Sequence, residues 1–331
     1  MKSGKVSDTV LGRSVLLEVK KVNQSVPCPR VGGGAAVVPG KRIASAMQTV
    51  VGEGTDTAYL AAVRAANSLA AKEAKPRYAS VAITIPKAME ERELRKMQER
   101  AGQYFLEGGV EILGGHTAVS RNVEAPVATV QMYGELSEAA GLDASSFLGM
   151  DVVMTKYCGL GGTALLAGHY REELEERYQK RFIKRAAQLL SEIQKNGECQ
   201  IALENGAVYA HAAAEGGVFG ALWELAEYAQ CGLKIDLRRI PILQETVEIC
   251  EVFDLNPYQL RTEGVFLFLT EHGERLCEKL SEAGICAAVI GKTVAGLDRA
   301  VHNEEEVRYL EPNRVEEYER IRSLREASGV E

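Results

Sequence analysis

Apolar and polar positions alternate with two different periods in the first half of the chain. After Arg77, the run YASVAITIP alternates with a period of two, which predicts a half-buried strand ending at Pro86. Residues 89–109 follow a helical period instead, with one apolar face made of Leu94, Met97, Ala101, Tyr104 and Phe105. A short strand at 110–113, a loop GGHTAVSRNVEAP and a strand VATVQMYGEL come next, so we expect a strand, helix, strand, loop, strand unit.

An alanine-rich stretch precedes this unit. Residues 57–76 predict a helix, because alanine has the highest helix propensity and its small side chain allows close packing on a sheet. The strand pattern breaks over 134–149, where glycines flank LSEAAGLDASSF. We therefore place a hinge there, between an N-terminal domain at 1–140 and a C-terminal domain at 148–331.

The second half repeats the alternation of strands and helices with different content. A buried strand MDVVMT leads into a glycine turn at 159–162 and a small helix, and a long charged helix is expected from 171 to about 195. The remaining predicted elements are a helix after Gly217, strands at 232–236, 264–270 and 286–291, a helix at 273–283 and a surface helix in the tail. The predicted fold class is α/β (α+β), with two mixed domains.

The composition disfavours several classes of partner. The chain of 331 residues has a net charge of -7, and we interpret its basic clusters at 92–100 and 180–185 as solvated helix faces interleaved with acids. No nucleic-acid partner is expected. No apolar run reaches the ~18 residues of a membrane span, and the N-terminal pattern is not that of a secretory signal, so no membrane partner is expected either.

Seven scattered cysteines without a CxxC pair predict reduced thiols, a cytoplasmic location and no structural zinc site. Cys28, in the loop VPCPRVGGG, has two interpretations. It is a reactive thiol or a bystander, and the bystander is favoured because no basic residue at a defined spacing would activate it.

Several short sequence stretches between about Gly32 and Pro312 indicate a family by their order and spacing. They read GGGAAVVPGKRI, AANSLAAKEAKPRYASVAI, GVEILGGHTAV, DVVMTKYCGLGGTALLA, HAAAEGGVFGALWELAE, IPILQETVEIC, LNPYQLRTEGVFLF and AGICAAVIGKT. Together they resemble the aminoimidazole ribonucleotide (AIR) synthetase-like superfamily, and most closely the AIR synthase-related proteins of the hydrogenase-maturation branch.

The resemblance implies a homodimer whose N-terminal sheets pair into a central barrel, and a site for ATP and Mg²⁺. Members of the superfamily activate an amide-type or thiocarbamate-type oxygen by phosphorylation, and acidic side chains hold the cation against the phosphates. The positions that the resemblance assigns to cofactor binding are Gly32, Gly33, Gly34, Asn67, Gly114, Gly115, His116, Thr117, Glu215, Gly216 and Gly217.

The acidic residues of that pattern are replaced in this chain. The replacements are Gly34, one residue of Ala46–Gln48 (here taken as Met47), Ser68, Ala118, and Ala212 with Ala214. Without carboxylates, a cation is left to water and backbone oxygens. We therefore assign no metal ligand and no catalytic residue, and ATP and Mg²⁺ stay expectations of the resemblance alone.

Some polar residues near these loops have alternative interpretations. His116 and His211 are a metal pair or, as we favour, hydrogen-bonding residues. Glu215 is favoured as a helix cap, where the helix dipole stabilises negative charge. Glu53 and Asp56 are relocated cation ligands or, as we favour, part of an ordinary helix start.

Three functions are consistent with these residues. The first is a binding or partner protein that has lost Mg-ATP catalysis and acts on a protein partner or beside an intact paralogue. The second is an ATP-dependent enzyme whose ligands have moved to Glu53, Asp56, His116 and Glu215. The third is a metabolite-binding protein in which helices opened by Gly114 and Gly216 hold a phosphate-containing small molecule through backbone amides.

Overall fold

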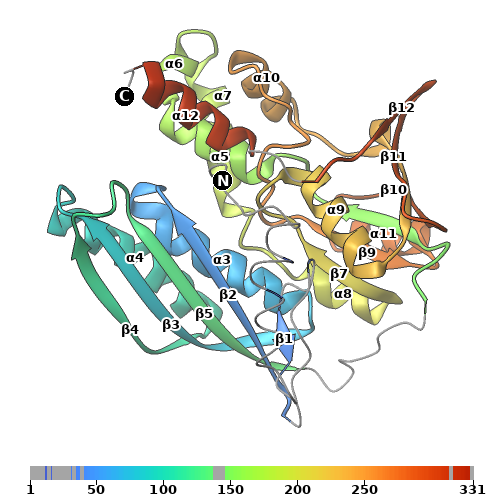
Figure 1. Cartoon of the computed structure of the whole chain (residues 1–331), viewed down its shortest axis with the longest axis horizontal. Helices are drawn as coiled ribbons and strands as arrows, with labels where there is room; N and C mark the ends of the chain where they lie inside the picture. Colours follow the sequence, from blue (N-terminus) through green and yellow to red (C-terminus); the bar gives the residue numbers. More distant parts are fainter. Residues whose placement is uncertain are drawn as a thin grey trace. The chain divides into compact units, whose positions relative to one another are not determined.

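The computed structural model of the protein describes residues 12, 16, 31, 35–37, 41–136, 146–312 and 316–328. The chain forms two compact units (Figure 1). One unit is Gly34–Gly141, and the other joins Leu142–Glu331 with Met1–Gly33, of which residues 12, 16 and 31 are described. Both units combine helices with a mixed sheet, so the predicted α/β fold class is confirmed.

The Gly34–Gly141 unit is a five-stranded sheet in the order β1-β2-β5-β3-β4. Its strands are β1 (Ala36–Val37), β2 (Ile43–Val51), β3 (Ala74–Pro86), β4 (Glu111–Ser120) and β5 (Val127–Leu136). Strands β3 and β4 are parallel and the other neighbours are antiparallel. Two helices pack on one face of this sheet (Figure 1), α3 (Thr57–Ala70) against the strands and α4 (Glu91–Gly108) against α3.

The alanine-rich helix is shorter than its composition predicts. It ends at Ala70, and Ala74 already pairs with Leu136 of β5. Strand pairing therefore overrides helix propensity over the last residues of the expected helix, as tertiary contacts commonly do. The helix itself is buried along almost its whole length, since its small side chains let it lie close to the sheet.

The predicted apolar face of α4 forms part of the core of this unit. Met97, Ala101 and Phe105 are buried, while Leu94 and Tyr104 are half-buried. The ring of Tyr104 also meets Tyr59 of α3 edge to face, with centroids 5.7 Å apart. The helical period of the sequence thus identifies the side of α4 that faces α3.

The second unit contains a seven-stranded mixed sheet in the order β12-β11-β8-β10-β6-β9-β7. Its strands are β6 (Asp151–Thr155), β7 (Ala207–Ala212), β8 (Gly232–Asp236), β9 (Phe266–Thr270), β10 (Ala287–Val294), β11 (Arg299–Asn303) and β12 (Glu306–Tyr309). Its helices are α5 (Leu160–His169), α6 (Arg171–Glu175), α7 (Lys180–Gln188), α8 (Glu198–Glu204), α9 (Gly217–Ala229), α10 (Gln244–Val252), α11 (Gly273–Glu282) and α12 (Glu317–Ser328).

Two predictions for this unit need correction. The long charged helix expected from 171 to 195 is broken into α6, α7 and a 3₁₀ turn at Leu189–Ser191. The tail does form helix α12, but it is not a simple surface helix, because Tyr318 is fully buried and Ile321 is nearly so. Its amphipathic character is weak in sequence, and only the structure shows what it packs against.

No helix among the described residues is both long and apolar enough to cross a membrane.

Candidate functional site

The glycine turn at 159–162 begins helix α5 and is closed by another part of the chain. Gly159 is the N-cap, with φ of 69°. Its N–H donates to the hydroxyl of Thr262 at 3.0 Å, and the N–H of Gly162 donates to the carbonyl of Arg261 at 2.9 Å. Because the first amides of a helix lack intrahelical partners, residues 261 and 262 supply acceptors that α5 would otherwise lack.

The glycine pair before α9 is closed by the same part of the chain. Gly216 is the N-cap, and Gly217 follows with φ of 66°. A Cβ on Gly217 would lie 2.5 Å from the carbonyl oxygen of Tyr258, so a close approach of two backbones requires glycine at this position. The N–H of Phe219 donates to that carbonyl at 3.1 Å. Residues 256–263, here called the covering segment, therefore lie over the starts of both α5 and α9.

The covering segment carries a buried ion pair. Arg261 and Glu263 are 2% and 1% exposed, and Arg261 Nε lies 2.9 Å from Glu263 Oε1. A Cβ on Gly161 would lie 2.0 Å from Glu263 Oε2, which places this carboxylate against the first turn of α5. A negative charge is stabilised there by the helix dipole. The chain thus supplies its own anion at a glycine-opened helix.

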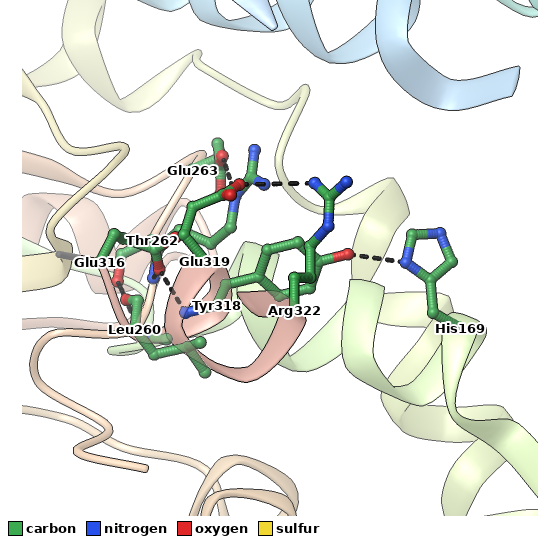
Figure 2. A network of polar contacts seen from close by, with 10 residues as sticks. His169, Leu260, Thr262, Glu263, Glu316, Tyr318, Glu319 and Arg322 are labelled. Atoms are coloured by element: carbon green, nitrogen blue, oxygen red, sulfur yellow. Dashed lines mark hydrogen bonds and ion pairs between the residues drawn. The ribbon is translucent and has the colours of Figure 1, made fainter. Parts of the chain in front are cut away.

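Residues at the start of helix α12 bind the covering segment (Figure 2). Glu316 Oε1 accepts hydrogen bonds from the backbone N–H groups of Arg261, at 2.7 Å, and Tyr318, at 3.2 Å. The guanidinium of Arg261 lies 5.1 Å from the ring centroid of Tyr318, whose hydroxyl is 2.6 Å from Nδ1 of His169 on α5. One buried polar network therefore connects α5, the covering segment and α12.

Glu316 is the group of this network that titrates near neutral pH. It is 6% exposed, and burial raises its pKa from the ordinary 4.5 to about 7, although the nearby Arg261 opposes that effect. Its second oxygen, Oε2, has no hydrogen-bond partner among the described residues. The protonated form is favoured because a buried carboxylate with one unsatisfied oxygen is costly.

A second buried ion pair lies at the end of β6. Lys156 follows the strand with φ of 54°, and its Nζ lies 2.7 Å from Glu198 Oε1 of α8. The same ammonium donates to the carbonyls of Gly264, at 2.7 Å, and Lys195, at 2.5 Å. Burial raises the pKa of Glu198, and Lys156 opposes that effect. Together with the carbonyl of Glu192, at 3.4 Å, these acceptors satisfy the ammonium, which holds the 192–198 region beside the sheet.

The GGHT residues of the N-terminal unit lie in a strand and not in a loop. Gly114, Gly115, His116 and Thr117 belong to the exposed edge strand β4, so the expectation that Gly114 opens a helix is wrong. A Cβ on Gly115 would lie 1.9 Å from the carbonyl oxygen of Val81, so the close pairing of β4 with β3 requires this glycine. Whether these four residues bind a cofactor stays a prediction.

The replaced acidic position Ser68 lies beside Gln48, a neighbour of Met47 in β2. Gln48 of β2 donates from Nε2 to the hydroxyl of Ser68 on α3 at 3.4 Å, and Ser68 is 7% exposed. Asn67, the amide that the chain retains, is buried next to Ser68. Met47 points the other way and is 60% exposed. A neutral hydrogen bond thus joins Ser68 to Gln48, which is one of the three residues among which the resemblance places a second acid.

The favoured helix-start interpretation of Asp56 is correct only in part. Asp56 is the N-cap of α3, but its side chain makes no capping hydrogen bond and instead lies 2.6 Å from Arg100 of α4. Glu53 is buried just before the 3₁₀ turn Gly54–Asp56. Among the residues that the structure describes, no three His, Cys, Asp or Glu side chains form a group that could hold a metal ion.

The histidine near the second glycine pair lies beside a carboxylate, but its Nε2 makes no hydrogen bond among the described residues, so a hydrogen-bonding role stays a prediction. His211 of β7 is buried, and its Nε2 lies 3.0 Å from Glu224 Oε2 of α9. Glu215 is half-buried and precedes the N-cap, which is Gly216, so it is not itself the cap residue. Anion binding at Gly216 and Gly217 stays a prediction. An anion would compete there with the Tyr258 carbonyl, which already accepts a hydrogen bond from the N–H of Phe219.

Four of the six described cysteines lie in the core, and Cys277 and Cys286 are half-buried. Cys158, Cys199, Cys231 and Cys250 are buried, and burial raises the pKa of each thiol, that of Cys250 to about 12. Cys28 lies outside the described residues, as do Gly32, Gly33 and Gly34. The predictions for those four positions are therefore untested.

The sequence did not indicate the charged residues that the structure buries. Arg261 and Glu263 stand two residues apart in LRTEG, immediately before the apolar strand VFLFLT. That position, between a turn and a buried strand, is the signal that could have found them. Glu316 and Lys156 carry no comparable local signal.

A five-stranded unit with two helices and a seven-stranded unit with paired glycine-opened helices define a two-unit mixed α/β protein. Residues 26–136 match the model of the AIR synthase related protein, N-terminal domain, and residues 149–302 match the model of its C-terminal domain. The chain belongs to the AIR synthase-related family, and it is similar to proteins of the hydrogenase-maturation branch.

Relatives of this branch are similar over most of the chain. A putative hydrogenase expression/formation protein of Methanocaldococcus jannaschii is 27% identical over 243 residues, covering 72% of this chain and 70% of that protein. Carbamoyl dehydratase HypE of Rhodobacter capsulatus is 25% identical over 273 residues, 79% of this chain and 78% of that protein. The crystal structure of a HypE–HypF complex has the same fold, with a TM-score of 0.72 at 20% identity, covering 91% of this chain and 100% of that one.

Proposed function

We propose that this AIR synthase-related protein works in hydrogenase-maturation chemistry as a binding or partner protein and has lost Mg-ATP catalysis. The observation that carries the proposal is the hydrogen bond between Gln48 and Ser68. Two carboxylates at that separation would repel each other by about 4 kcal/mol at the effective dielectric constant of a protein surface, and a cation between them removes the repulsion. An amide and a hydroxyl need no cation.

Other replaced positions support the same reading. Ala118 lies on the exposed edge strand β4, and Ala212 lies at the end of β7, so neither offers an oxygen to a metal ion. Met47 adds an apolar side chain to the sheet surface. The partner in the HypE–HypF structure is HypF, and we propose by analogy that this chain also acts through a protein partner or beside an intact paralogue.

Restoring the acids tests the proposal. In the Gln48→Asp/Ser68→Asp variant we expect Mg²⁺ to raise the melting temperature, because the ion relieves the new repulsion, while Mg²⁺ leaves the wild type unchanged. Thr49→Asp/Thr129→Asp is the matched control, since those hydroxyls form another neutral pair, 2.9 Å apart, between β2 and the neighbouring strand β5. A wild type stabilised by millimolar Mg²⁺ with ATP would count against the proposal.

We also propose that the protein is a homodimer that pairs the sheets of its N-terminal units. The proposal is supported by the sheet face opposite α3, where Ile43, Met47 and Val51 of β2 are exposed. Apolar side chains gathered on one sheet face favour burial against another surface. Met47→Glu should convert the dimer to a monomer in light scattering, whereas Leu106→Glu, on α4, should not change the mass. A monomeric wild type would refute the dimer.

The alternative is an ATP-dependent phosphoryl-transfer enzyme with relocated ligands. It is favoured by the similarity to an enzyme, the carbamoyl dehydratase. It requires Asp56 to leave Arg100 and bind a cation, so Arg100→Gln should then strengthen metal-dependent ATP binding. Unchanged ATP binding in that variant would set this alternative aside.

A further inference from the structure

Two basic clusters of the chain differ in their surroundings. In α4 the cations stand among an equal number of acids, and exposed pairs join Arg92 to Glu90, at 2.7 Å, and Arg95 to Glu91, at 3.0 Å. Residues 177–188, RYQKRFIKRAAQ, contain five cations and no acid. The interpretation of both clusters as interleaved with acids therefore holds for the first and is wrong for the second.

The cations of 177–188 gather on the solvent side of α7. Ile183 and Ala186 are the buried residues of this helix, and the basic side chains stand on the opposite arc, since successive residues of a helix turn by about 100°. Lys180, Arg181, Lys184 and Arg185 are exposed, as is Arg177 just before the helix. We call these five side chains the α7 basic face.

Two of the five cations of the α7 basic face pair with carboxylates of the same unit. Arg185 pairs with Glu245 of α10, and Lys180 lies 3.8 Å from Glu175 of α6. For Arg177, Arg181 and Lys184, no carboxylate among the described residues lies within ion-pair distance. Three adjacent unpaired cations on a chain of net charge -7 form a local field of the opposite sign to the whole protein.

Aromatic rings lie beside these cations. Tyr178 and Phe182 stack with centroids 5.2 Å apart, and the guanidinium of Arg185 lies 5.6 Å from the ring centroid of Phe182. Both rings are half-buried. Arginine and aromatic side chains together are typical of the residues that contribute most energy at protein interfaces.

We propose that the α7 basic face is a docking surface for an acidic segment of a partner protein. It deepens the proposed binding role by naming the chemistry of the partner. The four cations of α7 span about 8 Å of helix, at about 1.5 Å per residue, which is the spacing of clustered carboxylates on one or two turns of a partner segment. A nucleic acid is disfavoured because the patch is short and the rest of the chain is acidic.

The test uses the full-length protein and a fluorescent peptide of eight glutamates as probe. We expect binding at low salt that weakens as salt is added, and an affinity at least tenfold lower in Arg177→Gln/Arg181→Gln/Lys184→Gln. The control Arg92→Gln/Arg95→Gln/Lys96→Gln removes the same charge from α4 and should stay within twofold of the wild type. All six positions are surface side chains, and circular dichroism confirms that each variant is folded.

The proposal is overturned if the octaglutamate does not bind, or if both variants lose affinity equally. It is also overturned if single-stranded oligothymidylate of eight nucleotides binds more tightly than the peptide and loses that binding in the α7 variant, because the face would then bind nucleic acid. No arm of the experiment contains ATP or Mg²⁺, so its failure is distinct from failure of the proposed loss of catalysis.

Discussion

Replacing Glu316 by glutamine should stabilise the C-terminal unit at alkaline pH. The folded carboxyl has a pKa of about 7 against an ordinary value of 4.5. A raised pKa means that the folded protein favours the protonated form, so this stabilisation is complete below pH 4.5 and is lost as pH rises through about 7. Each pH unit between the two values corresponds to about 1.4 kcal/mol, so the loss is at most about 3 kcal/mol.

Glutamine keeps the geometry without the charge. Its side-chain oxygen can accept from the N–H groups of Arg261 and Tyr318 as Glu316 Oε1 does, and it stays neutral at every pH. We therefore expect Glu316→Gln to raise the free energy of unfolding by 1 to about 3 kcal/mol at pH 8.5. Near pH 5 the two proteins should be equal, or the variant slightly weaker because its new N–H group needs an acceptor.

Urea unfolding followed by tryptophan fluorescence measures this difference. The single tryptophan, Trp223, lies in α9, so its fluorescence reports on the unit that contains Glu316. Glu306→Gln, on the exposed strand β12, controls for loss of one negative charge. The reasoning is refuted if the difference between wild type and Glu316→Gln does not change between pH 5 and pH 8.5, or if the variant is the weaker protein at pH 8.5.

Two further substitutions test the glycine cap and the buried ammonium. Gly217→Ala should destabilise the C-terminal unit by about 3 kcal/mol, because alanine disfavours the left-handed conformation and its Cβ would meet the Tyr258 carbonyl. The control Gly168→Ala lies in open space on α5 and should leave the free energy of urea unfolding unchanged. Lys156→Met should lower the free energy of unfolding by about 3–5 kcal/mol, because it leaves Glu198 buried without its ion-pair partner. Thermal melts should show much of that loss recovered in Lys156→Met/Glu198→Gln. If the effects of the two substitutions simply add, the pairing is contradicted.

The elements that could be predicted are those with a regular local spacing of apolar residues. The strand after Arg77 and helix α4 follow from apolar spacing, because each buries one face and that face repeats with the geometry of the element. The end of α3 could not be predicted the same way, since it depends on pairing of Ala74 with a strand more than sixty residues later in the chain.

The buried polar network was not predictable for a related reason. Glu316 and Arg261 are separated by 55 positions, and Glu316 looks like an ordinary surface charge in its own neighbourhood. The sequence predicts that the glycine pair at 216–217 starts a helix, but it does not show why glycine is needed there. Without knowledge of the covering segment, the free amides of a helix start suggest a bound anion. The structure supplies that cause in the close approach of residues 258–260.

The Gln48–Ser68 pair could be predicted only in part from the sequence. Sequence comparison with the superfamily pattern indicates that acids are missing, yet it cannot tell whether the missing groups were neighbours. The hydrogen bond shows that Gln48 and Ser68 are neighbours, and Gln48 is one of the three residues among which that pattern places an acid.

Isothermal titration of the wild-type protein with ATP, in the presence and absence of millimolar Mg²⁺, tests the proposed loss of catalysis most directly. The account predicts no metal-dependent heat up to about 1 mM ATP, which corresponds to a binding free energy weaker than about -4 kcal/mol, and no release of phosphate. Micromolar binding that requires Mg²⁺, accompanied by turnover, would contradict it.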